Sequence, residues 1–178
     1  MKEQQFVLAL YPTVRGYAFV LFEGPESPFD WGTKDVREVP KNEHIIELVA
    51  RLLDRYHPEL LIMEDHEDRR CRRTQRIKRL CRSLVDLATA CDIQVHLYSK
   101  EAVKQCFAPA GARTKYEIAQ AVARHIPAFK HRLPPLRKIW MSEDPRQSLF
   151  DAAALGLTHY ASHDAGLSLE NETASLQR

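Results

Sequence analysis

One stretch of the chain constrains the fold more than any other: a short apolar run that ends on a cluster of acids. Residues 60–63 are Leu-Leu-Ile-Met, and carboxylates follow at once on Glu64, Asp65, Glu67 and Asp68. An apolar run of this length, closed by charged residues, is typical of a buried strand. The sequence therefore predicts a strand inside a sheet that carries acids to one edge of that sheet.

A dense basic segment follows these acids. It contains no acid, and its Lys and Arg residues are Arg69, Arg70, Arg72, Arg73, Arg76, Lys78, Arg79 and Arg82. Apolar residues recur at helical spacing from Ile77 and Leu80 to Ala88, which predicts one amphipathic helix that reaches Ala90. Acids next to bases at a strand end can hold a metal ion beside a polyanion. The alternative is a solvated helix face whose arginines pair with the nearby acids.

The periodicity of apolar residues and the turn residues between them predict the remaining elements. The expected strands are 6–10, 17–22, 31–39, 60–63 and 93–98, and the other expected helices are 42–56, 99–107, 114–125 and 145–160. Asn42 is the expected cap of the first helix, and Thr114 with Glu117 forms a capping-box pattern. The short turns between the first three strands predict an antiparallel meander, followed by parallel strands. We therefore predict an α/β fold, with a mixed five-stranded sheet and helices on both faces.

The length of 178 residues predicts one domain, which we place at residues 1–161. Residues 162–178 are polar and lack periodicity, so we expect a flexible tail. No apolar run approaches the roughly 18 residues that a membrane helix needs, and the first residues show no signal-peptide pattern. We expect a cytoplasmic protein that contacts no membrane. Its cysteines are then reduced thiols, at Cys71, Cys81, Cys91 and Cys106.

Four motifs follow one another along residues 6–161. A Pro-containing turn followed by Gly-Tyr lies in LALYPTVRGYAFV, residues 8–20, and the apolar run LLIMED contains Glu64. Lys104 is followed by GARTKYEIAQAV, which contains Lys115, and FDAAALGLTHY contains Asp151. In this order and spacing, the motifs resemble the RuvC family of Holliday junction resolvases. The resemblance implies a ribonuclease H-like fold for this chain.

The resemblance also implies a set of metal-binding carboxylates. Glu64 and Asp151 stand at two of the family's four acidic positions, so they are the candidate catalytic residues and the candidate ligands of Mg²⁺ or Mn²⁺. Two positions depart from the family. Tyr11 stands where an aspartate normally contacts both metal ions, and Ser148 stands where a further aspartate is usual. Asp144 is a candidate catalytic replacement, because it precedes the last helix and could reach the site from the loop.

Basic side chains near these acids are candidate contacts to the phosphate groups of a nucleic acid. The candidates are Arg69, Arg70, Arg72, Arg73, Arg76, Lys104, Arg113 and Lys115. The resemblance implies that this nucleic acid is branched DNA. It also implies a homodimer, because two strands of a four-way junction are cut.

Two functions therefore remain open. The first is a metal-dependent endonuclease that acts on branched DNA with a rebuilt acid set. Phosphodiester hydrolysis by two metal ions requires several carboxylate oxygens. The retained Glu64 and Asp151 therefore favour this function. The second is an inactive relative that keeps the fold and the basic surface, and binds DNA or RNA or acts as a scaffold; Tyr11 and Ser148 favour it. A phosphotransferase is a weaker alternative, because the chain lacks a Gly-rich phosphate loop.

Overall fold

The sheet is the centre of the molecule. A computed structural model describes residues 5–163. The strands are β1 (Val7–Pro12), β2 (Gly16–Gly24), β3 (Ser27–Asp35), β4 (Leu60–Glu64) and β5 (Gln94–Tyr98). They form one sheet in the order β3-β2-β1-β4-β5. The pairs β1–β2 and β2–β3 are antiparallel, whereas β1–β4 and β4–β5 are parallel. The predicted meander followed by parallel strands is confirmed.

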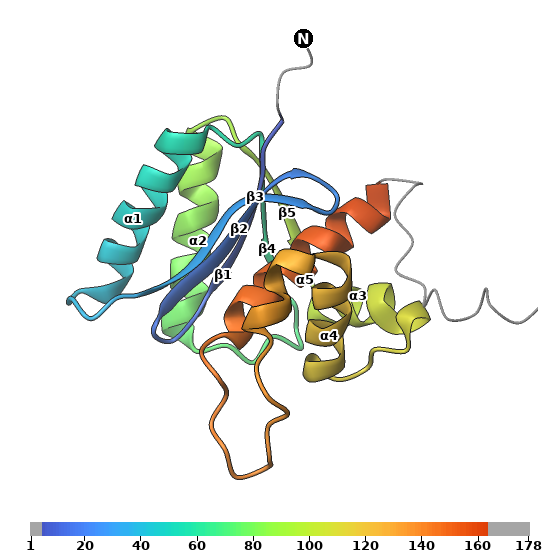
Figure 1. Ribbon diagram of the computed structural model, residues 1–178. Coiled ribbons are helices and arrows are strands. Elements are labelled where there is room, and N and C mark those ends of the chain that lie inside the picture. The colour runs from blue at the N-terminus through green and yellow to red at the C-terminus, as the bar shows by residue number, and fades with distance from the viewer. Residues whose placement is uncertain (1–4, 164–178) are drawn as a thin grey trace, which may run out of the picture.

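Helices cover both faces of this sheet, as predicted (Figure 1). The helices α1 (Lys41–Tyr56) and α2 (Gln75–Ala90) pack on one face. The opposite face carries α3 (Lys100–Phe107), α4 (Lys115–His125) and α5 (Gln147–His163). Two short 3₁₀ helices, η1 (Ala108–Ala110) and η2 (Pro127–Arg132), flank α4.

The buried strand predicted from the apolar run is β4, and all its residues are buried. Successive side chains of a strand point to opposite faces, so each central strand supplies two cores. Leu61 and Met63 belong to the core under α1 and α2, whereas Leu60 and Ile62 belong to the core under α5. Each of residues 60–63 therefore faces an apolar core, which explains the continuous apolar run.

Three local predictions were wrong. The turn predicted at residues 24–28 is only Pro25-Glu26, so β3 begins at Ser27 and ends before the predicted Val39. Asn42 is not the cap of α1, because Pro40 occupies that position. The Asn42 amide instead donates to the carbonyl oxygen of Arg76 and accepts from its guanidinium, at 3.1 and 2.8 Å. The amide thus connects α1 to α2.

The basic segment is only partly helical, which corrects the prediction of one long helix. Thr74 caps α2 by accepting a hydrogen bond from the backbone N–H of Ile77. Before it, the Asp65 carboxylate accepts from the N–H of Glu67 and the Asp68 carboxylate accepts from the N–H of Arg70, at 3.0 and 2.7 Å. Such side-chain hydrogen bonds favour turns over helix. The arginines from 69 to 73 therefore lie on a loop.

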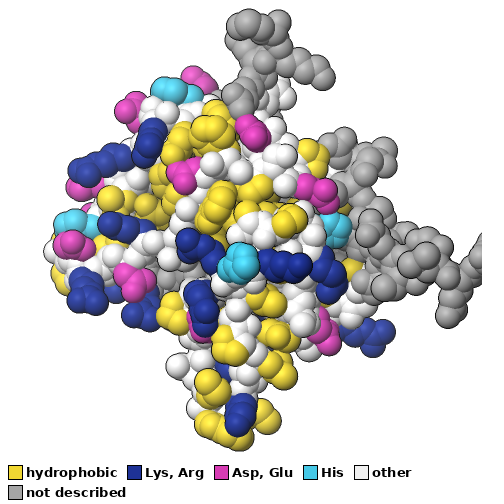
Figure 2. All heavy atoms as spheres, viewed as in Figure 1, with side chains coloured by type: hydrophobic (Ala, Val, Ile, Leu, Met, Phe, Trp, Pro, Cys, Tyr) yellow, Lys and Arg dark blue, Asp and Glu magenta, His cyan; other side chains and the backbone are white. Residues whose placement is uncertain are grey.

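The segment between η2 and α5 projects from the body of the protein (Figures 1 and 2). Its exposed apolar side chains are Leu136, Ile139, Trp140 and Met141. The last helix continues past the predicted domain end at residue 161 to His163, and residues 164–178 of the predicted tail lie outside the described residues. Among the residues described, no helix combines the length and apolar character needed to span a membrane.

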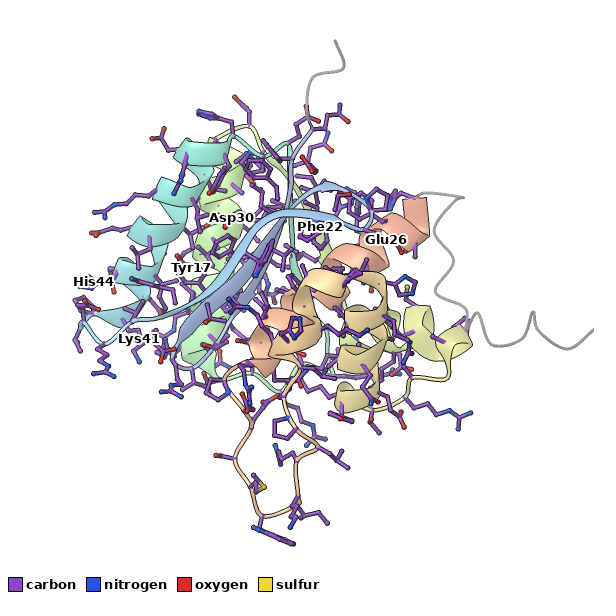
Figure 3. The ribbon with its side chains drawn as sticks, in the orientation of Figure 1. Tyr17, Phe22, Glu26, Asp30, Lys41 and His44 are labelled. Carbon is purple, nitrogen blue, oxygen red and sulfur yellow. The ribbon has the colours of Figure 1, made fainter. Side chains whose placement is uncertain are left out.

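A glycine allows α5 to pack closely on the sheet. A Cβ atom at Gly156 would lie 2.3 Å from the Phe22 ring, which is fully buried on β2 (Figure 3). We expect Gly156→Ala to destabilise the protein by about 1–3 kcal/mol through overpacking, measured by urea denaturation. Gly24→Ala is the matched control, because its Cβ would meet nothing nearer than 3.8 Å. Equal effects of the two substitutions would contradict this account.

Candidate functional site

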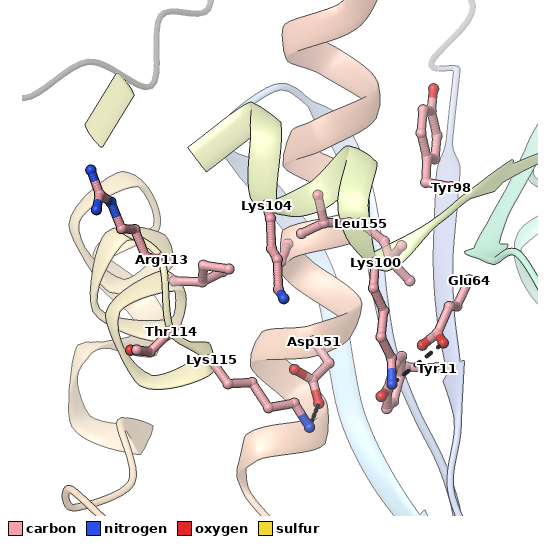
Figure 4. A pocket seen from close by; sticks show the side chains of 13 residues that line it. Tyr11, Glu64, Tyr98, Lys100, Lys104, Arg113, Thr114, Lys115, Asp151 and Leu155 are labelled. Carbon is pink, nitrogen blue, oxygen red and sulfur yellow. Dashed lines mark ion pairs between the residues drawn. The ribbon is translucent and has the colours of Figure 1, made fainter. Parts of the chain in front are cut away.

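A pocket of about 370 Å³ opens beside the ends of β1 and β4, between α3, α4 and α5 (Figure 4). Ionisable side chains from six different elements line it together with apolar ones. The lining residues are Tyr11, Glu64, Tyr98, Lys100, Val103, Lys104, Arg113, Thr114, Lys115, Ile118, Asp151, Ala154 and Leu155. The fold thus brings the candidate acids Glu64 and Asp151 to one pocket.

Strand register explains why Tyr11 and Glu64 share this pocket. Ala9 of β1 pairs in parallel with Ile62 of β4, and both face the core under α5. Side chains alternate along a strand, so the residues two positions further along point the same way. These residues are Tyr11 and Glu64. The strand β1 therefore presents a phenol where the resemblance implied an aspartate.

Helix starts supply the other charged groups. Lys115 is the first residue of α4, whose start is fixed by the predicted capping box of Thr114 and Glu117. Lys100 and Lys104 lie one turn apart on α3 and point toward the pocket, as Figure 4 shows. Asp151 lies near the start of α5. Because these helices share one face of the sheet, their charges converge on the strand ends.

Glu64 forms a buried ion pair with Arg73. The Arg73 guanidinium donates to Glu64 Oε2 at 2.8 Å, and the two side chains are only 11% and 5% exposed. The same guanidinium donates to the carbonyl oxygen of Pro12 at 2.6 Å and lies 4.3 Å from the centre of the Tyr11 ring. Burial lowers the pKa of Arg73, but the hydrogen bond to Glu64 and the nearby charges outweigh it and raise the pKa.

Asp151 forms a second ion pair, with Lys115. The Lys115 ammonium lies 3.0 Å from Asp151 Oδ2 and also contacts Glu143, and the Gln147 amide donates to Asp151 at 3.3 Å. Burial raises the pKa of Asp151, although Lys115 and Gln147 oppose that shift. Burial alone would lower the pKa of Lys115, but Asp151 and Glu143 raise it. Each of the two groups therefore favours the charged form of the other.

Tyr11 lies between these two ion pairs. Burial raises the pKa of its phenol well above the usual 10, and the nearby Asp151 and Glu64 carboxylates raise it further, against the opposing effect of Arg73. The phenol is consequently neutral at physiological pH. A neutral phenol donates or accepts hydrogen bonds, but it is a poor ligand for a hard divalent cation.

The donor set does not fit the metal pair that the resemblance implied. Glu64 and Asp151 each already contact a cation, and Lys100 lies 3.9 Å from Glu64 Oε1. Among residues 5–163, no group of three metal-ligating side chains includes either acid. Asp144, the candidate replacement, does not line the pocket, and Arg146 binds its carboxylate through two nitrogens at 2.9 and 2.7 Å. The charges of Glu64 and Asp151 are therefore already balanced by basic side chains of the same chain.

The predicted nucleic-acid contacts divide into three groups. Arg69, Arg70 and Arg72 are exposed on the loop before α2 and line two hollows beside the pocket, one of which shares Glu64, Lys100 and Lys104 with it. Lys104, Arg113 and Lys115 line the pocket itself. Arg73 and Arg76, in contrast, are engaged within the protein. Arg76 binds Asn42 and the carbonyl oxygen of Val14, at 2.8 and 3.0 Å.

Two functional positions escaped the sequence analysis. Lys100 was not predicted, although it follows the cap Ser99 and precedes Lys104 by one helical turn, a spacing that places both side chains on one face. Pairing of the arginines with the nearby acids was one of the alternatives predicted, but the specific pair of Arg73 with Glu64 was not. No local pattern in the sequence reveals this pair, because the loop between the two residues has no regular side-chain spacing.

Comparison with known proteins places the fold. No model of a known protein family matches the sequence, and no curated protein matches it. Among solved structures, RuvC from Thermus thermophilus is 22% identical over 89% of this chain and 96% of that chain, with a TM-score of 0.60. T. thermophilus RuvC in complex with a Holliday junction substrate is 19% identical over 92% of this chain and 98% of that chain, with a TM-score of 0.62.

The chain has a RuvC-like fold. This finding confirms the predicted ribonuclease H-like architecture. The RuvC-like resemblance drawn from the four motifs and the observed fold thus agree over most of the chain. Three of the four acidic positions implied by the resemblance, those held by Tyr11, Glu64 and Asp151, line the pocket. Ser148, at the fourth position, does not line it and donates a hydrogen bond to the carbonyl oxygen of Pro145 at 2.9 Å.

The Glu64–Arg73 pair provides a stability prediction. Arg73→Met leaves the Glu64 carboxylate buried without its hydrogen-bonded partner, so we expect a loss of about 3–5 kcal/mol in the free energy of unfolding. Adding Glu64→Gln to this variant should restore much of the loss, because the buried charge is then gone. A double-mutant cycle from urea denaturation measures the coupling. Strictly additive effects would show that the two side chains do not interact.

The Asp151–Lys115 pair provides a prediction about ionisation. Lys115 lowers the pKa of Asp151 against the effect of burial, so Lys115→Met should raise that pKa further. The stability lost in Lys115→Met should be full above the raised pKa and shrink as pH falls, because protonated Asp151 needs no cation. Carbon-detected NMR titration of the Asp151 carboxyl measures the shift. Lys104→Met, a change in the same pocket, should leave it nearly unchanged.

Proposed function

We propose that this protein is a RuvC-like nucleic-acid-binding protein that binds branched DNA without metal-dependent cleavage. The observation that carries the proposal is the charge arrangement at the pocket. Each candidate catalytic acid is neutralised by a basic side chain of the same chain, Glu64 by Arg73 and Asp151 by Lys115, and Tyr11 separates the two pairs. The acids therefore serve to position cations rather than to bind Mg²⁺ or Mn²⁺.

The surface beside these pairs suits a polyanion. Lys100 is 57% exposed at the pocket, and Arg69, Arg70 and Arg72 extend the same basic surface along the adjoining hollows. Phosphate groups that reach this surface would displace counterions, which makes the affinity strongly dependent on salt. The neutral Tyr11 hydroxyl can donate a hydrogen bond to a phosphate oxygen, which a carboxylate in its place could not do.

The branched substrate and the dimer belong to the proposal. The solved complex of T. thermophilus RuvC contains a Holliday junction, and the shared fold is the reason to test that substrate first. A homodimer would present two copies of the basic surface to the two sides of a junction. Binding through both copies raises the apparent affinity for a junction over a linear duplex.

A metal-dependent nuclease is the second candidate function. One observation favours it: Glu64 Oε1 is buried and has no hydrogen-bond partner among the described residues. An unsatisfied carboxylate oxygen at the pocket wall is a potential ligand atom. The nearby Lys100 ammonium, at 3.9 Å, supplies charge to this oxygen without such an ion.

The experiment is junction binding and cleavage in the same reactions. We expect the purified protein to shift a labelled four-way junction more strongly than linear duplex, and to cut neither in Mg²⁺ or Mn²⁺. Replacing Arg69, Arg70 and Arg72 together by Gln should weaken binding at least roughly 10-fold at 0.1 M salt and reduce the salt dependence by about 3 in slope.

The matched control replaces three exposed bases away from the pocket, Lys34, Arg37 and Arg51, by Gln. It should leave affinity nearly unchanged, although the net charge falls equally. Metal-dependent cleavage that disappears in both Glu64→Gln and Asp151→Asn would establish the nuclease instead. Loss of binding to the same extent in both triple variants would indicate attraction by net charge alone.

A further inference from the structure

A cluster of three histidines lies where the C-terminal part of α5 passes β5. His96 belongs to β5, and His159 and His163 belong to α5. One ring nitrogen of each lies within 4.8 Å of the others, and within the described residues this is the one group of three metal-ligating side chains so close together. The His159 and His163 rings are stacked with centres 4.3 Å apart, and the His96 ring lies 5.2 Å from that of His159.

The sequence places these rings together by two periodicities. His159 and His163 are four residues apart on α5, so they share one face of the helix. On β5, Val95 and Leu97 pack against the core under α1 and α2. Alternation therefore directs His96 to the opposite face, toward α5. The cluster is thus a consequence of regular structure and not of a flexible loop.

Hydrogen bonds orient two of the rings. Nδ1 of His163 lies 2.9 Å from the backbone carbonyl oxygen of His159. A carbonyl oxygen only accepts, so in the neutral ring Nδ1 carries the proton and Nε2 keeps a free lone pair. Nδ1 of His159 lies 3.0 Å from the Tyr98 hydroxyl, which leaves Nε2 of that ring for another partner. Hydrogen bonds of this kind to the second ring nitrogen orient metal-binding histidines in proteins.

We propose that His96, His159 and His163 bind one divalent transition-metal ion of the zinc class. Imidazole is a preferred ligand of such ions, and Zn–N bonds of about 2.0–2.1 Å place tetrahedral ligand atoms about 3.4 Å apart. The three nitrogens lie within 4.8 Å of one another, so they must approach by no more than about 1.4 Å to reach that geometry. His163 is exposed, so the ion can enter from solvent, and a water molecule can complete its coordination.

The chemistry of this site differs from that of the pocket. It offers three nitrogen ligands and no carboxylate, which selects Zn²⁺, Ni²⁺ or Cu²⁺ over the hard ions Mg²⁺ and Ca²⁺. An ion held by β5 and α5 together would stabilise the packing of this helix on the sheet. The inference does not depend on the proposed function, because metal binding is measured without nucleic acid.

The test uses the full chain without an affinity tag. Isothermal titration with Zn²⁺ should show one ion bound per chain, and saturating Zn²⁺ should raise the thermal unfolding temperature. His96→Ala and His163→Ala should each lower the Zn²⁺ affinity by more than roughly 100-fold, since loss of a ligand exceeds loss of an outer hydrogen bond. Tyr98→Phe should lower it by about 10-fold for the latter reason.

His44→Ala is the matched control. His44 is a half-buried histidine of α1 (Figure 3). Its Nδ1 lies 2.8 Å from the carbonyl oxygen of Pro40, four residues earlier, just as Nδ1 of His163 lies near that of His159. Its variant should bind Zn²⁺ like the wild type. Co²⁺ should give a spectrum of nitrogen and oxygen ligands without thiolate charge-transfer bands. Affinity unchanged in His163→Ala, thiolate bands from a cysteine site, or no binding at excess Zn²⁺ would each overturn the proposal. His163 is exposed, so its truncation leaves the core intact.

Discussion

The structure of the pocket depends on the buried ion pair between Glu64 and Arg73. The strand β4 needs apolar side chains on both faces, and its last residue is nevertheless a carboxylate that is only 5% exposed. A buried carboxylate requires a cation with good hydrogen-bond geometry. Arg73 supplies it and also binds the carbonyl oxygen of Pro12, so one guanidinium connects β4, β1 and the loop before α2.

Because of this ion pair, the presence of Tyr11 where the resemblance implies an aspartate affects the charge balance of the whole pocket. A carboxylate at position 11 would add negative charge beside Glu64 and Asp151, and divalent ions could balance that charge. Tyr11 lacks that charge and is much larger than an aspartate, and the centre of its ring lies 4.3 Å from the Arg73 guanidinium. The remaining two acids are then balanced by one arginine and one lysine. The Tyr11 ring and the Arg73 guanidinium therefore belong to one arrangement in which cations of the protein balance both acids.

The sequence predicted those features that periodicity and capping determine. The buried β4, the capping box at Thr114 and Glu117, and the approach of Glu64 to Asp151 followed from local patterns and from the RuvC resemblance. It did not predict the start of α2, because turns made by the Asp65 and Asp68 side chains competed with a helical pattern of arginines. Partners across loops, such as Arg73 for Glu64, depend on tertiary geometry that no spacing in the sequence encodes.

The helix α5 contributes residues to both the pocket and the histidine cluster. Asp151 and His159 are eight residues apart, about 12 Å along the helix axis. Tyr98 contacts both regions, since it lines the pocket and its hydroxyl lies 3.0 Å from His159. An ion on the histidines would favour one orientation of the His159 ring and hence one position of the Tyr98 hydroxyl at the pocket wall. The helix α5, which presents Asp151 to the basic surface, would then couple the histidine cluster energetically to the pocket.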